Sequence, residues 1–215
     1  MTRVKICGLT DSEDAKIAAE AGADAVGVIV DVPVETPRKV SIEKAAEILC
    51  SVPLFVSKVV VLMPKSVEEA ADIADRLNPD AIQLHGEESL EFILELRKRI
   101  KARIIKVLHA DDNTKINNIM KYAGISDAIL LDTKFGNITG GTGKTHDWTK
   151  SKMICDMIMP TPMILSGGLN PENVRNAIDA VKPYAVDVSS GVESTPGKKD
   201  AEKIGMFLKA AKINE

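Results

Sequence analysis

Short apolar runs alternate with longer amphipathic stretches eight times along the 215-residue chain. The apolar runs are rich in Val, Ile and Leu and contain few polar residues, which is typical of parallel strands buried on both faces. We therefore predict eight buried strands, at Val4–Ile6, Ala25–Val30, Phe55–Leu62, Ala81–Leu84, Ile104–Val107, Ala128–Leu131, Met163–Leu165 and Ala185–Val188.

Apolar residues at helical spacing predict a helix after nearly every strand. The residues Thr10–Glu13 have the spacing of a capping box, and Asn170 followed by Pro171 is typical of a helix start. The stretch after Asp147 has the weakest helical pattern. The predicted helices are Asp11–Ala21, Ile42–Ser51, Ser66–Leu77, Ser89–Ile100, Thr114–Tyr122, Pro171–Val181 and Asp200–Ile213.

This alternation predicts a parallel α/β fold with a single domain over residues 1–215. A closed (β/α)8 TIM barrel fits the number of strands, whereas an open doubly wound sheet, the structural alternative, usually has fewer. A short repeat at the start of every second strand supports closure, although chance similarity among strands of one composition would also explain it. The repeat consists of Asp24-Ala25-Val26-Gly27, Asp80-Ala81-Ile82-Gln83, Asp127-Ala128-Ile129-Leu130 and Tyr184-Ala185-Val186-Asp187.

Composition argues against several classes of function. A net charge of −3 and an aromatic content of 3% do not favour a nucleic-acid-binding protein. No stretch approaches the roughly 18 apolar residues that a membrane span needs. Three widely spaced cysteines predict neither a disulfide framework nor a paired metal motif, so we expect a reducing cytoplasm.

Polar and glycine-rich residues collect where the predicted strands end, which is the side of such barrels that carries the active site. Three glycine clusters, at 140–143, 166–168 and 189–191, follow three successive strands. Glycine allows backbone N–H groups to approach an oxyanion closely, so these clusters predict a phosphate site. The expected phosphate-binding residues are Gly141, Thr142, Gly143, Gly167, Gly168, Ser190 and Gly191.

Four side chains at strand ends or in the loops after them are candidates for chemistry. Cys7 is either a small buried hydrophobe or, as a thiolate, a base or nucleophile. Asp132 ends a wholly apolar strand and is either a capping residue or a general acid or base. Arg38 and His85 are either ordinary loop residues or substrate contacts, and a metal role for His85 is not favoured because it lacks clustered ligand partners.

The combination of these motifs resembles the phosphoribosylanthranilate isomerases over nearly the whole chain. Threonine at position 36 departs from the serine that usually precedes Pro-Arg in that family. The motifs that carry the resemblance are Lys5-Ile6-Cys7-Gly8, Pro37-Arg38, Gln83-Leu84-His85-Gly86, Leu131-Asp132, Gly140-Gly141-Thr142-Gly143, Ser166-Gly167-Gly168-Leu169, Asp187-Val188-Ser189-Ser190-Gly191-Val192-Glu193 and Pro196-Gly197-Lys198-Lys199-Asp200.

The resemblance implies an Amadori rearrangement of a phosphorylated sugar derivative without a cofactor or a metal. It implies that Asp132 is the general acid and Cys7 the general base. It also implies that Arg38 orients the substrate and that Asp187 lies near its anthranilate group, with His85 as a further substrate contact. The partner is then a small phosphorylated molecule, and the sequence leaves open whether the chain is a monomer or a homodimer.

Two alternatives to this isomerase remain from the residues themselves. The first is another phosphate-binding barrel enzyme, such as a sugar-phosphate epimerase or a synthase. An epimerase is expected to carry metal-ligating His and Asp residues on several strands, whereas the chain has only three histidines. A synthase of the indole-forming type needs Lys and Glu at strand ends, where we do not find them. A non-catalytic phosphate-binding barrel is the other, and it gives no reason for an acid and a thiol to share one rim.

Overall fold

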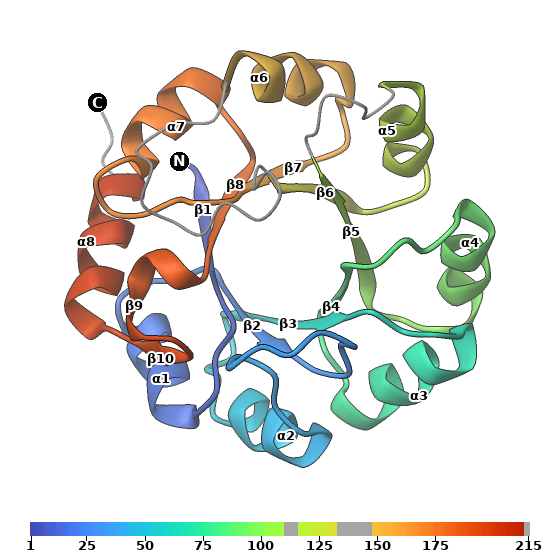
Figure 1. The fold of residues 1–215 in the computed structure, drawn as a ribbon, viewed down its shortest axis with the longest axis horizontal. Helices are drawn as coiled ribbons and strands as arrows, with labels where there is room; N and C mark the ends of the chain where they lie inside the picture. Colours follow the sequence, from blue (N-terminus) through green and yellow to red (C-terminus); the bar gives the residue numbers. More distant parts are fainter. Residues whose placement is uncertain (110–115, 133–147, 213–215) are drawn as a thin grey trace.

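Eight parallel strands close into a barrel in the order β1-β2-β3-β4-β5-β6-β7-β8, with helices around the outside (Figure 1). We describe residues 1–109, 116–132 and 148–212 of a computed structural model. The predicted (β/α)8 barrel is therefore confirmed. Its strands are β1 (Arg3–Cys7), β2 (Ala25–Ile29), β3 (Ser57–Leu62), β4 (Ala81–Leu84), β5 (Arg103–His109), β6 (Ala128–Asp132), β7 (Met163–Ser166) and β8 (Ala185–Val188).

The helices lie where the amphipathic stretches predict them, and the weak pattern after Asp147 also forms a helix, α6. Within the described ranges, no helix has the length and apolar character needed to cross a membrane. The helices are α1 (Ser12–Glu20), α2 (Ile42–Cys50), α3 (Val67–Leu77), α4 (Leu90–Arg99), α5 (Ile116–Ala123), α6 (Trp148–Met157), α7 (Val174–Val181) and α8 (Ala201–Lys212).

Three local predictions are wrong. Helix α7 starts at Val174 and not at Pro171, because Asn170 accepts from the N–H groups of Glu172 and Asn173 in a turn before the helix. The third strand begins at Ser57 and not at Phe55, because Leu54 and Phe55 lie in an exposed turn before it. The capping box at Thr10 does not form. The side chain of Asp11 caps α1 by accepting from the backbone N–H of Asp14 at 2.8 Å, and the Thr10 hydroxyl instead donates to the carbonyl of Gly197 at 2.7 Å.

The repeat at the even-numbered strands has a structural meaning. Its alanines are all among the residues of one small apolar cluster, together with Val59, Ile105 and Ile164 from odd-numbered strands. This cluster is distinct from the larger core, which contains the helix residues and the strand residues packed against them. Small side chains on alternate strands thus leave room for the larger ones in the layered interior. These alanines are Ala25, Ala81, Ala128 and Ala185.

The aspartates of the repeat join neighbouring strands. Asp24 accepts from the backbone N–H of Val4 at 2.8 Å, and its own N–H donates to the Val4 carbonyl at 2.9 Å. Asp80 and Asp127 make the same pair of bonds to the strands before them, β3 and β5. Each aspartate therefore fixes the amino end of an even-numbered strand against its odd-numbered neighbour.

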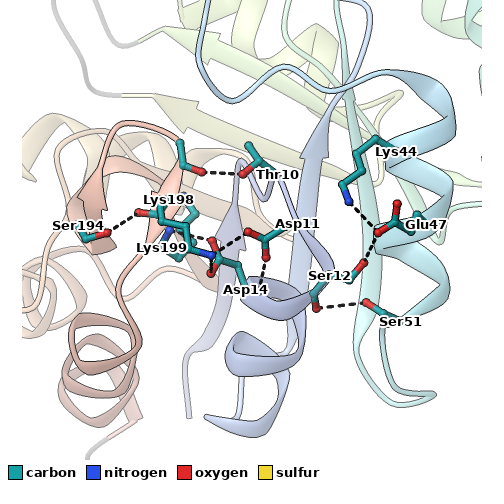
Figure 2. Close-up of polar contacts among 11 residues, drawn as sticks. Thr10, Asp11, Ser12, Asp14, Lys44, Glu47, Ser51, Ser194, Lys198 and Lys199 are labelled. Atoms are coloured by element: carbon teal, nitrogen blue, oxygen red, sulfur yellow. Dashed lines mark hydrogen bonds and ion pairs between the residues drawn. The ribbon is translucent and has the colours of Figure 1, made fainter.

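A short element that the sequence analysis did not predict follows β8. The 3-10 helix η1 (Ser190–Val192) leads into a hairpin of β9 (Glu193–Thr195) and β10 (Lys198–Lys199). Figure 2 shows how this hairpin is held against the start of α1. Lys198 donates to Asp11 at 2.8 Å and to Asp14 at 2.9 Å, and the buried Asp14 also accepts from the Lys199 N–H at 2.9 Å.

We predict that Asp14→Ala lowers the free energy of unfolding by about 1–3 kcal/mol, because it leaves the buried N–H of Lys199 without an acceptor. Urea denaturation measures the change. Asp72→Ala is the control, because Asp72 is an exposed partner of Arg76 on α3 and its loss should cost less than about 0.5 kcal/mol. Equal stability of the two variants would contradict the prediction.

Candidate active site

Cys7 is the last residue of β1 and is almost fully buried, with 5% of its surface exposed. It pairs with Gly27 of β2, where a Cβ atom would lie 2.9 Å from the Cys7 sulfur and 3.0 Å from Cε of Lys5. A larger residue than glycine would therefore push against both side chains. Gly27 keeps open the space in which the thiol and the end of the lysine lie together.

Below the thiol, a buried lysine links three strands inside the barrel. Nζ of Lys5 donates to Asp187 at 2.8 Å and to Gln83 at 3.0 Å. Asp187 also accepts from the Ser166 hydroxyl at 3.3 Å. The four residues come from β1, β4, β7 and β8, so this polar group connects strands on different sides of the mouth.

These charges change the pKa values of the groups involved. Burial raises the pKa of the Cys7 thiol, and the positive charge of Lys5 is the main influence that lowers it. Burial is the largest single influence on Lys5 and lowers its pKa, but Asp187 and Cys7 together outweigh burial, so the net pKa of Lys5 is raised. Lys5 is therefore a cation at neutral pH, and Cys7 is a thiol in the protein without substrate.

Arg38 is fixed over the same mouth by a second ion pair. Its Nε and a terminal nitrogen donate to the two oxygens of Glu193 at 2.7 and 2.6 Å. Glu193 also accepts from Lys199 at 3.0 Å. The hydroxyl of Thr36 accepts from the Arg38 N–H at 3.3 Å, so the threonine here supplies a hydroxyl at the position where the family usually has serine. A Cβ at Gly8 would lie 2.9 Å from Cδ of Arg38, which places the arginine beside the end of β1.

Asp132 ends β6 and is half-buried, next to His109 of β5 and Ser166 of β7 in the strand register. The ring of His109 contacts that of His85 edge-on, with 5.9 Å between centroids. Burial lowers the pKa of His85, and the negative charge of Asp132 partly opposes this. Nδ1 of His85 is buried and has no hydrogen-bond partner among the residues that the structure describes.

The loop that carries His85 is held by a second buried lysine. Nζ of Lys106 donates to Glu88 at 2.7 Å and to the carbonyl of Gly86 at 2.6 Å. Glu88 in turn accepts from the Gly86 N–H at 3.0 Å. These bonds close the loop after β4 on itself and fix the backbone next to His85.

The loops after β7 and β8 touch each other. Gly167 and Gly168 have φ values of 97° and 68°, which favour glycine. A Cβ at Gly191 would lie 1.9 Å from the carbonyl oxygen of Leu169, so the two loops approach too closely for any side chain there. The predicted phosphate residues Gly167, Gly168 and Gly191, with Ser190, are thus neighbours. Gly141, Thr142 and Gly143 lie outside the described residues.

The structure thus places every candidate catalytic and substrate-contact side chain at the carboxyl end of the barrel. Cys7, Asp132, His85 and Asp187 are last strand residues or lie within one residue of a strand end, and Arg38 reaches the mouth from the loop after β2. The sequence analysis missed four polar residues that hold them. The four are Lys5, Gln83, Glu193 and Lys199. For Lys5 and Gln83, a polar side chain inside an otherwise apolar strand was the signal that could have identified them.

A barrel with this rim belongs to the class of (β/α)8 enzymes that act on small anionic substrates. The family model described as N-(5'phosphoribosyl)anthranilate (PRA) isomerase matches residues 4–210. The chain therefore belongs to the phosphoribosylanthranilate isomerase family. A relative from Methanocaldococcus jannaschii, N-(5'-phosphoribosyl)anthranilate isomerase, is 48% identical over 99% of this chain and 97% of its own length.

Solved structures agree with this family. Two structures of phosphoribosyl anthranilate isomerase from Thermotoga maritima are 45% and 41% identical, with TM-scores of 0.88 and 0.84, and each covers 99% of both chains. The second is of monomers generated from a dimeric protein. A further isomerase structure, 42% identical with a TM-score of 0.84 over 99% of both chains, contains reduced 1-(o-carboxyphenylamino)-1-deoxyribulose 5-phosphate.

We predict that Gly191→Ala weakens binding of this reduced product analogue by roughly tenfold or more, because the new Cβ must displace the Leu169 carbonyl and therefore moves the two loops that are predicted to bind the phosphate. Isothermal titration calorimetry measures the affinity. Gly205→Ala in α8 is the matched control, because apart from its chain neighbours and the backbone of its own helix no heavy atom of the described residues lies within 4 Å of its Cβ position. Unchanged affinity in Gly191→Ala would show that the contact between the two loops does not support the phosphate site.

Proposed function

We propose that Cys7 and Asp132 act as the base and the acid of the isomerisation that the family catalyses in tryptophan biosynthesis. The reaction is the Amadori rearrangement of N-(5-phosphoribosyl)anthranilate to 1-(2-carboxyphenylamino)-1-deoxyribulose 5-phosphate. The observation that supports the proposal is the position of the two side chains: both end strands of one closed barrel, on strands that are not neighbours. A substrate in the mouth can therefore be reached from two sides.

The chemistry needs one proton delivered and one removed. Asp132, in its protonated form, gives a proton to the furanose ring oxygen, which opens the ring to a Schiff base. Cys7, as the thiolate, then removes the proton from C2 of the sugar, and the resulting enolamine tautomerises to the ketone. Each group is expected to contribute roughly 10²–10⁴-fold to the rate. C1 of the sugar is reduced as C2 is oxidised within the same molecule, so neither step needs an external oxidant or reductant.

The remaining predicted residues have positions consistent with substrate contacts. Arg38 is held rigidly by Glu193 and lies beside the end of β1, where it can orient the substrate. The unbonded Nδ1 of His85 can meet a polar group of the anthranilate side. Asp187 has one oxygen on Lys5 and the other on the Ser166 hydroxyl. The touching loops of Gly167, Gly168, Ser190 and Gly191 supply backbone N–H groups for the phosphate.

We predict that Cys7→Ser and Asp132→Asn each lower kcat by at least about 100-fold, because each removes one proton-transfer group. The loss of substrate fluorescence, with phosphoribosylanthranilate generated in situ, measures turnover. Affinity for the reduced product analogue should change little, because neither substitution alters the loops after β7 and β8. Cys50→Ser is the matched control, since Cys50 is exposed at the end of α2. Near-normal turnover in either active-site variant would remove that residue from the mechanism.

We further propose that the chain forms a homodimer through the amino end of its barrel. Leu54 and Phe55 are 87% and 94% exposed in the turn before β3. The same end has a cavity of about 980 Å³, lined by these two residues and by barrel residues such as Val59 and Ile105. An exposed apolar turn beside a partly apolar cavity makes this surface self-complementary. In a dimer with a two-fold axis, Leu54 and Phe55 of each copy can fill the cavity of the other copy. The dimeric Thermotoga maritima relative supports this state.

We predict that the double variant Leu54→Ser, Phe55→Ser sediments as a monomer at concentrations where the unchanged chain is a dimer. Its activity should remain, because the altered turn lies at the barrel end opposite the candidate site. Analytical ultracentrifugation measures the state, and Leu94→Ser, at a 44% exposed apolar residue on α4, is the control. A monomeric unchanged chain at tens of micromolar would contradict the proposal.

A further inference from the structure

We propose that Lys5 is a positioning residue that supplies the positive charge against which the Cys7 thiolate forms, and that Asp187 holds this charge in place. The inference rests on the proposed function, in which Cys7 is the base. It adds a specific role to a lysine that lies inside the barrel and that the catalytic scheme above does not use. It also gives Asp187 a role that does not depend on contact with the substrate.

The two side chains lie on the same face of one strand. Lys5 and Cys7 are two residues apart on β1, so both point into the barrel. A Cβ at Gly27 would lie 2.9 Å from the Cys7 sulfur and 3.3 Å from Nζ of Lys5. The ammonium and the thiol therefore border one small space, and glycine at position 27 is what leaves that space open.

The ammonium is fixed there by its other partners. A lysine side chain has four flexible carbons, but Nζ of Lys5 is bound to Asp187 at 2.8 Å and to Gln83 at 3.0 Å. Lys5 and Asp187 are 3% and 5% exposed. Water screens charges poorly at such a site, so the field of the ammonium acts strongly on a neighbouring sulfur. Burial lowers the pKa of Lys5, but Asp187 and Cys7 together raise it by a larger amount, so Lys5 stays charged.

Within the described ranges, four charged groups face Cys7 from the elements packed around it. They are Lys5 from β1, Asp187 from β8, Lys199 from β10 and Arg38 from the loop after β2. Burial raises the pKa of the thiol; Lys5 is the largest opposing influence, whereas Asp187 raises the pKa and Lys199 lowers it less than Lys5 does. Removing Lys5 and Asp187 together therefore still leaves the thiolate less stable, because the effect of Lys5 exceeds that of Asp187.

A purely structural ion pair is the competing explanation. In that case Lys5 joins β1, β4 and β8, and its loss lowers stability without altering the titration of the thiol. The two explanations differ in one measurable quantity, the pKa of Cys7 in a folded variant.

The experiment titrates Cys7 by thiolate absorbance at 240 nm in the full chain carrying Cys50→Ser and Cys155→Ser. Subtracting the same chain with Cys7→Ser removes the tyrosine and backbone signals. We expect Lys5→Met to raise the apparent pKa of Cys7 by about one unit or more, the size of effect expected for an opposite charge this close. Lys5→Arg keeps the positive charge, so the apparent pKa of Cys7 in this variant should lie close to that of the parent chain.

Lys5→Met leaves Asp187 buried without its partner and can unfold the barrel. The double variant Lys5→Met, Asp187→Asn removes both charges and should still raise the apparent pKa of Cys7, by less than Lys5→Met alone, because the influence of Lys5 on the thiol exceeds that of Asp187. The matched control is Lys106→Met, Glu88→Gln, which removes a buried lysine–carboxylate pair that does not face Cys7. That control should leave the Cys7 titration unchanged.

A second measurement is the pH dependence of kcat/KM. Its rising limb, which reports the base in the free enzyme, should move to higher pH in Lys5→Met by the same amount as the thiol titration. A folded Lys5→Met or double variant whose Cys7 titrates within about 0.3 unit of the parent, or at lower pH, overturns the proposal. The titration needs no substrate, so it can succeed or fail independently of the test of Cys7 as the catalytic base.

Discussion

The parallel pairing of β8 with β1 is the interaction on which the rest of the molecule depends. It closes the barrel and aligns Lys5 directly with Asp187 across the seam. Without this pairing, the first strand would be a free edge, and the thiol of Cys7 would not lie beside the loops after β7 and β8. Closure also removes the exposed backbone groups that an open sheet would present. The fold and the site are thus completed by the same set of hydrogen bonds.

Charges inside a protein are costly, because two ions lose their hydration when they are buried. Hydrophobic residues of similar volume often give the same stability or a higher one. The described residues nevertheless include three buried lysine–carboxylate pairs, Lys5–Asp187, Lys106–Glu88 and Lys199–Glu193. The first lies in the interior below the mouth. The second lies on the outer face of β5 and orders the loop that carries His85. The third lies in the hairpin after β8, where Glu193 also binds Arg38. All three are best understood as devices that fix side chains near the mouth.

The two ends of the barrel have different properties. The carboxyl ends of the strands carry the thiol, the carboxyl group, the histidines and the glycine-rich loops. The amino ends carry the aspartates that join paired strands, together with an exposed apolar turn at Leu54 and Phe55. This separation allows the amino end to serve stability and self-association without interfering with the chemistry at the other end. It follows from the parallel sheet, in which all strands point the same way.

The sequence by itself determined the architecture and most of the catalytic candidates. Periodicity is local, so the eight buried strands and their helices could be predicted, and the residues after each strand then had to share one rim. The start of β3 was missed because Leu54 and Phe55 are apolar, and only the tertiary structure shows that they are exposed. The cap of α1 was misplaced because Asp11 competes with Thr10 and the hairpin engages the threonine.

Contacts between residues far apart in the chain were decided only by the tertiary structure. Glu193 binds Arg38 from 155 positions away and Asp187 binds Lys5 from 182 positions away. No local pattern reports such pairs, because their meeting depends on barrel closure and on the hairpin after β8. The chemical groups were thus visible in the sequence, but the charges that hold and tune them became visible only once the first and last strands were joined.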